Sequence, residues 1–293
     1  MAVPMAQCRR RAGQQETIID HPRLITVLSL EQALALEGND APTLKLIHVS
    51  AAEGYHDYHL PGALLVTPGE LVHGAPPAPG RLPALARLEA LFGRLGYRGD
   101  ETFVVYDDEG GGWAGRFAWT LDVIGHDRWI YLDGGIHAWA EAGGALASGA
   151  CAYPPATAPR LSIDTGPIAE VEDVLAAIAD PDQIVWDVRS REEFLGLRSG
   201  SARAGHVPGA VHLDWQHLKD PARATRLVED LPGLLSEHGI DRNRAIITHC
   251  QSHHRSGLSY LVGRILDFPR IRAYHGSWSE WGNRDDLPVS TDP

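Results

Sequence analysis

The chain has 293 residues, of which 44% are hydrophobic and 22% charged, and its formal net charge is −12. This length predicts about two domains, and the composition is that of a globular protein with enough apolar side chains for two cores. The negative charge argues against nucleic acid as a partner, and no apolar run approaches the ~20 residues that a membrane-spanning helix needs.

The N-terminal residues carry an arginine cluster at 9–11 with no apolar stretch behind it, so they do not resemble a secretory signal. We expect residues 1–19 to form a disordered tail. The three cysteines, Cys8, Cys151 and Cys250, lie in unrelated contexts and do not predict a disulfide framework. This pattern favours a reducing, cytoplasmic location in which a thiolate stays free, with Cys8 and Cys151 taking no part in catalysis.

Residues 20–145 predict a first α/β domain. Short apolar runs suited to strands alternate there with longer amphipathic runs suited to helices. The predicted strands are 45–49, 102–106 and 129–132, and the predicted helices are 30–36, 82–95 and 116–124. Such alternation is typical of a mainly parallel sheet covered by helices on both faces.

Residues 146–166 are predicted to be a linker, because they are rich in proline, glycine and alanine and lack apolar periodicity. Residues 167–293 then repeat the order of the first domain. The predicted helices are 171–178, 227–237 and 258–267, and the predicted strands are 183–188, 245–248 and 271–274. The fold class expected from this order is α/β, with two similar domains.

Identical residues 142 positions apart support a duplicated domain. The pairs are Gly115 with Gly257, Gly134 with Gly276, and Trp139 with Trp281. A period near half of the chain indicates two copies of one domain, because solenoid repeats are only about 20–50 residues long. His59 and His206 open the same His-x-Pro-Gly-Ala turn in both copies, which favours a structural role. At the register of the glycines, Cys250 lies opposite Asp108.

The stretch 249–257 contains the residues best suited to chemistry. It lies between a predicted strand and a predicted helix, so backbone N–H groups and the positive end of the helix dipole favour a thiolate at Cys250. Cys250 is therefore the candidate nucleophile. The polar and basic residues after it indicate an anionic substrate, and the candidate binding residues are Gln251, Ser252, His253, His254, Arg255 and Ser256.

Four motifs in order resemble those of the tandem-domain rhodaneses, which are thiosulfate sulfurtransferases. They are Asp187-x-Arg189 followed by Glu193-Phe194, the turn at 205–210, the loop opened by Cys250, and the closing segment 276–281. The resemblance covers nearly the whole chain beyond residue 20. It implies two rhodanese-like domains, an inactive first copy, a catalytic second copy and transfer of a sulfane sulfur through a persulfide on Cys250, without a cofactor.

The cysteine-containing loop departs from the common family pattern at His253, where glycine is usual. The change resembles a His-His variant of some bacterial tandem rhodaneses and differs from the loops most typical of 3-mercaptopyruvate sulfurtransferases. It favours thiosulfate as the sulfur donor and leaves mercaptopyruvate as the alternative. Backbone N–H groups of residues 251–256 are expected to hold the persulfide, with positive charge from whichever of His253, His254 and Arg255 face the sulfur.

Two further groups are expected near the loop. Asp187 and Arg189 are predicted to pair at the end of a strand, as a scaffold or, for Arg189, as a substrate contact. Trp278 and Trp281 are expected in the core or the pocket wall. No metal site is predicted, because one short loop rarely supplies a closed tetrahedral set and a metal would block the nucleophile.

The first copy carries Asp107, Asp108 and Glu109 where the second carries its cysteine. Carboxylates would repel thiosulfate and cannot carry a sulfane sulfur, so this copy is predicted to be inactive. A solvated acidic loop is expected there in preference to a cation site.

Two other functions compete with sulfur transfer. A cysteine phosphatase would use Cys-x5-Arg, whereas Cys250 and Arg255 form Cys-x4-Arg, a smaller loop that suits a sulfur atom. A non-catalytic binding module would not need an intact cysteine loop. The expected partners are a small anionic sulfur donor and an acceptor, which is cyanide, a thiol or a sulfur-acceptor protein, with no role for nucleic acid or membrane.

Overall fold

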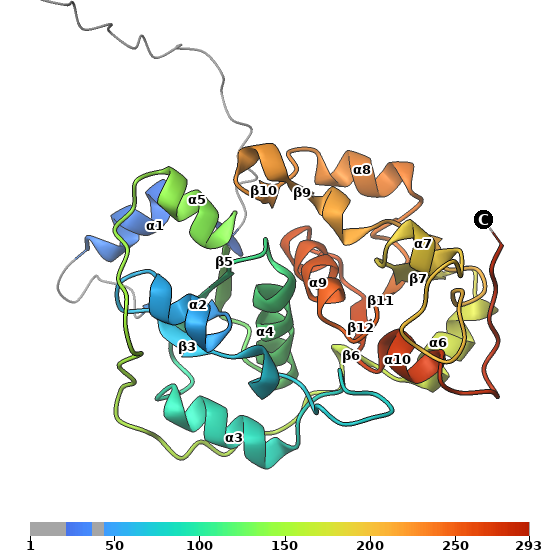
Figure 1. The fold of residues 1–293 in the computed structure, drawn as a ribbon, viewed down its shortest axis with the longest axis horizontal. Helices are drawn as coiled ribbons and strands as arrows, with labels where there is room; N and C mark the ends of the chain where they lie inside the picture. Colours follow the sequence, from blue (N-terminus) through green and yellow to red (C-terminus); the bar gives the residue numbers. More distant parts are fainter. Residues whose placement is uncertain (1–21, 37–43, 293) are drawn as a thin grey trace, which may run out of the picture.

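Two parallel five-stranded sheets of the same topology form the molecule (Figure 1). The computed structural model describes residues 22–36 and 44–292, so the predicted tail and Cys8 lie outside the described residues. The first sheet has the order β1 (Leu24–Ile25), β5 (Trp129–Leu132), β4 (Thr102–Asp107), β2 (Leu44–Val49) and β3 (Leu64–Val66). The second has the order β6 (Ile168–Ala169), β12 (Ile271–Tyr274), β11 (Ala245–His249), β7 (Gln183–Asp187) and β8 (Val211–His212). The predicted α/β class is confirmed.

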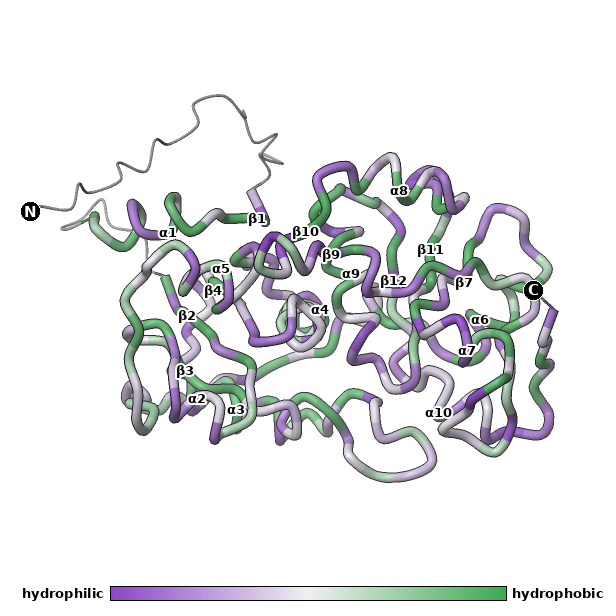
Figure 2. Tube along the Cα trace, turned by 45° about the horizontal axis from the view of Figure 1, so that its top comes forward, coloured by the Kyte–Doolittle hydropathy of each residue, from purple (hydrophilic) through white to green (hydrophobic). Residues whose placement is uncertain are grey.

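Helices cover both faces of each sheet. Those of the first domain are α1 (Val27–Leu34), α2 (Ala52–Asp57), α3 (Leu85–Arg94), α4 (Gly112–Val123) and α5 (Gly135–Glu141). Those of the second domain are α6 (Val171–Ile178), α7 (Arg191–Phe194), α8 (Leu231–Glu237), α9 (Arg255–Ile265) and α10 (Ser277–Trp281). Hydrophobic and hydrophilic stretches alternate along the tube in both halves (Figure 2). This alternation is what a sheet buried between two helical layers requires.

The predicted strands 129–132 and 271–274 and the predicted helix 171–178 have the observed boundaries. The helix predicted over 227–237 begins only at Leu231, where Asp230 caps the start of α8. The preceding residues end an antiparallel hairpin of β9 (Lys219–Asp220) and β10 (Arg226–Leu227). Short edge strands such as β1 and β6 were not predicted, because two residues carry no periodicity.

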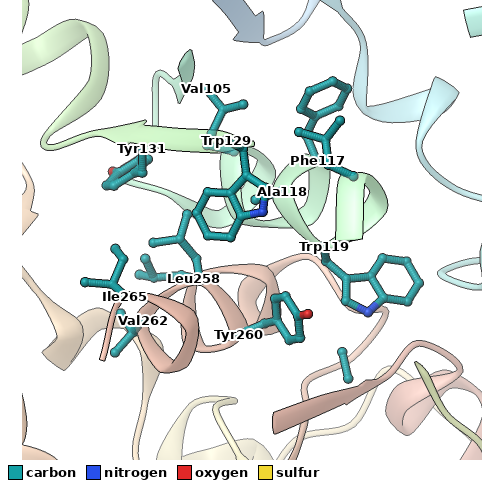
Figure 3. Close-up of a cluster of buried hydrophobic side chains, with 14 of the residues drawn as sticks. Val105, Phe117, Ala118, Trp119, Trp129, Tyr131, Leu258, Tyr260, Val262 and Ile265 are labelled. Carbon is teal, nitrogen blue, oxygen red and sulfur yellow. The ribbon is translucent and has the colours of Figure 1, made fainter. Parts of the chain in front are cut away.

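The core that joins the two domains lies between α4 and α9, which run side by side in the middle of Figure 1. Figure 3 shows Trp119 of α4 on the side of Tyr260 of α9, whereas Phe117 points away from α9. Each sheet also has its own outer core, with α1, α2 and α5 on one and α6 and α10 on the other. The two copies therefore share a continuous apolar layer.

The repeated glycines Gly115 and Gly257 allow this close helix contact. A Cβ atom on Gly115 would lie 2.2 Å from the Gly257 carbonyl oxygen, and one on Gly257 would lie 2.4 Å from the Gly112 carbonyl oxygen. Both distances are too short for any side chain. The glycine pair that revealed the sequence repeat is thus the point where the two copies meet.

The segment 143–166 contains no helix and no strand, although Ala147 forms a bridge with His59. It packs along the first domain: the Thr157 N–H donates to the Gly93 carbonyl (2.9 Å), and the Tyr153 hydroxyl donates to the Leu65 carbonyl (2.9 Å). Within the described residues, no helix is both long and apolar enough to cross a membrane.

Candidate active site

The cysteine loop, residues 250–255, joins the end of β11 to the start of α9. The start of α10 holds it in place. The N–H groups of Trp278 and Ser279 donate to the carbonyls of Cys250 (3.0 Å) and Gln251 (2.8 Å). The Ser277 hydroxyl accepts from the N–H of His253 at 3.1 Å. The loop is therefore fixed by hydrogen bonds to the start of α10.

The Cys250 side chain is buried, with 1% of its surface exposed. Burial raises the pKa of its thiol, but the Arg255 guanidinium and hydrogen bonds from the backbone and side chain of Ser256 outweigh it, so the pKa lies below its ordinary value. His254 lowers it further. The surroundings of the sulfur thus favour the thiolate.

Arg255 is held by Glu193, which α7 presents to it. The two guanidinium nitrogens donate to the two carboxylate oxygens at 2.6 and 2.9 Å. Glu193 is positioned by a capping box in which Ser190 begins α7. This pairing fixes the cation beside the sulfur and uses both of its outer nitrogens.

His253 is buried and has a φ of +53°, a left-handed conformation in which glycine is favoured. Its Nδ1 lies 2.8 Å from the Ser256 hydroxyl, and its ring contacts Trp119 of the first domain, with ring centroids 4.6 Å apart. Burial lowers the pKa of His253 well below its ordinary value, and Arg116 lowers it further. Of the three residues expected to supply positive charge, His253 is the one whose burial disfavours the charged form.

His254 lies at the boundary between the two domains. Its Nε2 forms a hydrogen bond with the Glu109 carboxylate, and its ring stacks on Trp113 with centroids 4.3 Å apart. Trp215 approaches the same ring edge-on at 5.7 Å. The first domain therefore contributes directly to the surroundings of the cysteine loop.

Gln251 and Ser252 contact other segments of the protein. Gln251 donates from Nε2 to the Ser201 hydroxyl at 3.1 Å. The backbone of Ser252 abuts Gly80, where a Cβ atom would lie 2.1 Å from the Ser252 carbonyl oxygen. Only glycine fits at position 80 against this turn of the loop.

Asp187 and Arg189 form a fully buried ion pair with an N–O distance of 2.6 Å. Arg189 also donates to the Gly205 carbonyl at 2.7 Å, which ties the strand end to the predicted turn. Burial raises the pKa of Asp187, but Arg189 and His249 outweigh it and the pKa is well below its ordinary value. These contacts favour a scaffold role for Arg189, and its Nη1 is buried without a hydrogen-bond partner among the described residues.

The acidic loop, residues 107–111, is the counterpart of the cysteine loop in the first domain. The prediction that this acidic loop is solvated was wrong, because Asp107 is fully buried. Its two carboxylate oxygens accept hydrogen bonds from four backbone N–H groups, at 3.3, 3.0, 2.8 and 2.9 Å, those of Glu109, Gly110, Gly111 and Ala114. Burial raises the pKa of Asp107 to about 6, while the hydrogen bonds from Ala114 and Gly111 oppose this rise. The start of α4 thus already holds an anion of the protein itself.

Sequence reasoning missed the contribution of the first domain to the cysteine loop. Glu109 and Arg116 are contacts of His254 and His253, yet they precede them by more than 130 residues. The duplicated glycines were the one available signal, since they imply that the two equivalent helices meet. Among the described residues, no group of three His, Cys, Asp or Glu side chains is arranged to hold a metal ion.

Comparison with known proteins agrees with this architecture. The sequence matches the family described as rhodanese-like domain twice, over residues 30–142 and 170–284. The chain belongs to the rhodanese-like family. This tandem rhodanese is 49% identical over 249 residues to the thiosulfate sulfurtransferase of Pseudomonas aeruginosa, covering 85% of this chain and 92% of the relative.

A second relative is the 3-mercaptopyruvate sulfurtransferase of Escherichia coli K12. It is 28% identical over 243 residues, which cover 82% of this chain and 86% of the relative. The crystal structure of YnjE superposes with a TM-score of 0.83 at 21% identity, covering 94% of this chain and 70% of that chain. At this identity the superposition shows the tandem rhodanese fold alone.

Proposed function

We propose that this tandem rhodanese transfers a sulfane sulfur from thiosulfate to a thiophilic acceptor through a persulfide on Cys250. The observation that carries the proposal is the sulfur of Cys250 beside Arg255 and Ser256, which together lower the pKa of its thiol at the start of α9. The identity with the Pseudomonas aeruginosa enzyme supports thiosulfate as the donor.

The chemistry follows from a thiolate that is already ionised. The Cys250 sulfur attacks the outer sulfur of thiosulfate, the S–S bond of thiosulfate breaks, and sulfite leaves with the bonding electron pair. The negative charge of the new persulfide then lies near Arg255 and the Ser256 N–H. Cyanide or a thiolate attacks the terminal sulfur and regenerates the Cys250 thiolate. No general base is needed at any step.

The dimensions of the loop support sulfur transfer over phosphoryl transfer. With four residues between Cys250 and Arg255, the loop is one residue shorter than a phosphatase cradle. Both outer nitrogens of Arg255 are already bound by Glu193, so they are not free to form a fork around a phosphoryl group. Backbone N–H groups of the cysteine loop are proposed to hold the donor, with the buried Arg189 as support.

Three finer statements belong to the same proposal. The domain limits are residues 20–145 for the inactive copy, 146–166 for the linker and 167–293 for the catalytic copy. The acceptor is cyanide, a small thiol or a sulfur-acceptor protein. A reducing compartment such as the cytoplasm suits a chain that depends on a free thiolate.

Steady-state turnover tests the proposal. The full chain is assayed for thiocyanate formed from thiosulfate and cyanide, with Cys250→Ser as the inactive variant and Cys151→Ser as the matched control. We expect activity in the parent and in Cys151→Ser only. A higher kcat/KM with 3-mercaptopyruvate than with thiosulfate would make mercaptopyruvate the donor. Release of phosphate from an aryl phosphate, with no thiocyanate formed, would overturn the proposal of sulfur transfer.

A further inference from the structure

Arg116 is a fully buried arginine of the first domain that points at the cysteine loop of the second. It lies on α4, and its guanidinium donates to four carbonyl oxygens. The acceptors are Gly80 at 2.7 Å, Leu71 at 2.6 Å, Arg81 at 3.4 Å and His253 at 3.3 Å. It also lies over the ring of Trp119 at 4.7 Å. One guanidinium thus connects the segment 71–81 of the first domain with the cysteine loop.

No carboxylate of the described residues pairs with Arg116, and its Nε has no hydrogen-bond partner there. Burial lowers the pKa of this guanidinium to about 9, and the one negative group that opposes the change is Cys250. A buried cation without a carboxylate is costly, because desolvation is not repaid by an ion pair. The hydrogen bond to the His253 carbonyl brings the guanidinium to the cysteine loop, and the sulfur of Cys250 is the anionic group of that loop that acts on it.

The position equivalent to Arg116 in the second copy, 142 residues later, is Leu258. The two residues are placed reciprocally: Leu258 packs against Gly111 of the acidic loop, whereas Arg116 reaches His253 of the cysteine loop. The acidic loop has its own buried carboxylate, and a cation is absent from the equivalent position of the opposite helix. At this pair of equivalent positions, the cation lies opposite the loop that carries the cysteine. The acidic loop is contacted instead by Lys219 of β9, whose Nζ donates to the Glu109 carbonyl.

We propose that Arg116 of the inactive copy is a positioning residue of the cysteine loop and the buried counter-cation of the sulfur on Cys250. This inference rests on the proposed function, in which that sulfur carries negative charge as thiolate and persulfide. Its hydrogen bond to His253 holds the loop against the first domain. Its charge adds to that of Arg255, and its contribution to the thiolate is the smaller of the two because Arg255 dominates the surroundings of the sulfur.

Other titratable or charged groups surround the same loop and must be kept constant in any test. They are His253, His254 and Arg255 on the loop itself, His249 on β11, Asp187 and Arg189 at β7, Glu193 on α7, His275 after β12, and Glu109 of the acidic loop. None of these residues is substituted in the test. Loss of the Arg116 charge does act on His253 and His275, whose pKa that charge lowers.

The test is the pH dependence of Cys250 alkylation by iodoacetamide, read as intact mass in the full chain. In Arg116→Leu, which installs the residue of the other copy, we expect the thiol titration to move up by about half to one unit. Because a higher thiol pKa leaves less thiolate at pH 7, alkylation there should slow by about three- to tenfold. Arg116→Lys keeps the charge and should restore the titration, while losing part of kcat because it cannot hold four carbonyls.

Tyr260→Phe is the matched control, because it removes a hydrogen bond to Asp122 across the same helix pair without touching the cysteine loop. It should leave the titration unchanged. A titration of Arg116→Leu that superimposes on that of the parent chain would overturn the proposal. If Arg116→Leu does not fold, Arg116→Lys is used instead. A thiol pKa of Cys250 that rises in Arg116→Lys as far as it does in Arg255→Gln would contradict a role for the charge.

Alkylation reports on the thiolate whether or not sulfur is transferred. A chain that gains no sulfur from thiosulfate, yet shows the Arg116 effect, would refute the proposed function and retain the electrostatic contact. If Arg116→Leu transfers sulfur as well as the parent chain and has the parent thiol titration, the role of Arg116 is refuted and the proposed function is retained.

Discussion

The cysteine loop and the acidic loop occupy the same place in two copies of one fold, and both hold negative charge at the start of a helix. In the second domain the N–H of Ser256 reaches the sulfur of Cys250. In the first domain the N–H of Ala114, the equivalent residue 142 positions earlier, donates to the Asp107 carboxylate at 2.9 Å.

The difference lies in which anion fills the site. The Asp107 carboxylate is bonded to four backbone N–H groups and is a permanent occupant. The sulfur of Cys250 can bond to a second sulfur and release it. The duplicated scaffold therefore stabilises an anion in both copies. The side chain that reaches the helix start, Asp107 in the first copy and Cys250 in the second, decides whether chemistry follows.

The first way to break the comparison is to remove the sulfur. Cys250→Ser should lose at least about a thousandfold in thiocyanate formation, because no other described residue near the loop can carry a sulfane sulfur. Asp108→Cys places a thiol at the equivalent position of the acidic loop and should gain no activity, since Asp107 already uses the N–H groups. Thiocyanate formation by Asp108→Cys in a Cys250→Ser background would contradict the claim that Asp107 already occupies the N–H groups at the start of α4.

The second way is to remove Arg255, whose equivalent 142 positions earlier is Trp113. Arg255→Gln should lower kcat/KM by about a hundredfold, the size of effect expected when one preorganised charge is lost. The pKa of the Cys250 thiol should rise toward its ordinary value of about 8.5, so thiolate that is present below that pH in the parent is lost. The pH profile of alkylation measures this shift, and an unchanged profile would count against Arg255.

The third way is to empty the acidic loop. Asp107→Ala leaves buried N–H groups without their acceptor and should reduce the free energy of unfolding by about 2–4 kcal/mol. Sulfur transfer by the folded protein should persist. Urea denaturation and thiocyanate assays on the same sample check both parts, and loss of activity without loss of stability would show that Asp107 has a direct role.

The smallest effect is expected at His253, which replaces the glycine common in the family. His253→Ala loses the ring packed on Trp119 and keeps the left-handed backbone, so it should cost about 2 kcal/mol. His253→Gly loses the same ring and relieves about 1 kcal/mol of backbone strain. Thermal unfolding should rank the parent above His253→Gly and His253→Ala last; the reverse order of the two variants would contradict the strain argument.

Much of this comparison could be predicted from the sequence. The duplication, the parallel α/β class and the central strands were visible because buried strands and amphipathic helices have strong periodicity. The position of Cys250 before a helix start followed from the same pattern.

The rest could not be predicted, because it depends on contacts between the two copies. In the sequence, Asp107 belongs to an acidic run that looked exposed. The sequence does not show that four backbone N–H groups converge on its carboxylate. The lowered pKa of His253 follows from its burial, and its ring packs on Trp119 of the other copy. The contact of His254 with Glu109 follows from the packing of α4 on α9.

The most direct test is intact and peptide mass spectrometry after the full chain is incubated with thiosulfate. The account predicts a gain of one sulfur atom on the peptide that contains Cys250, its removal by cyanide, and no gain on peptides of the acidic loop. No added sulfur on Cys250 under conditions in which the thiol is alkylated would contradict the account.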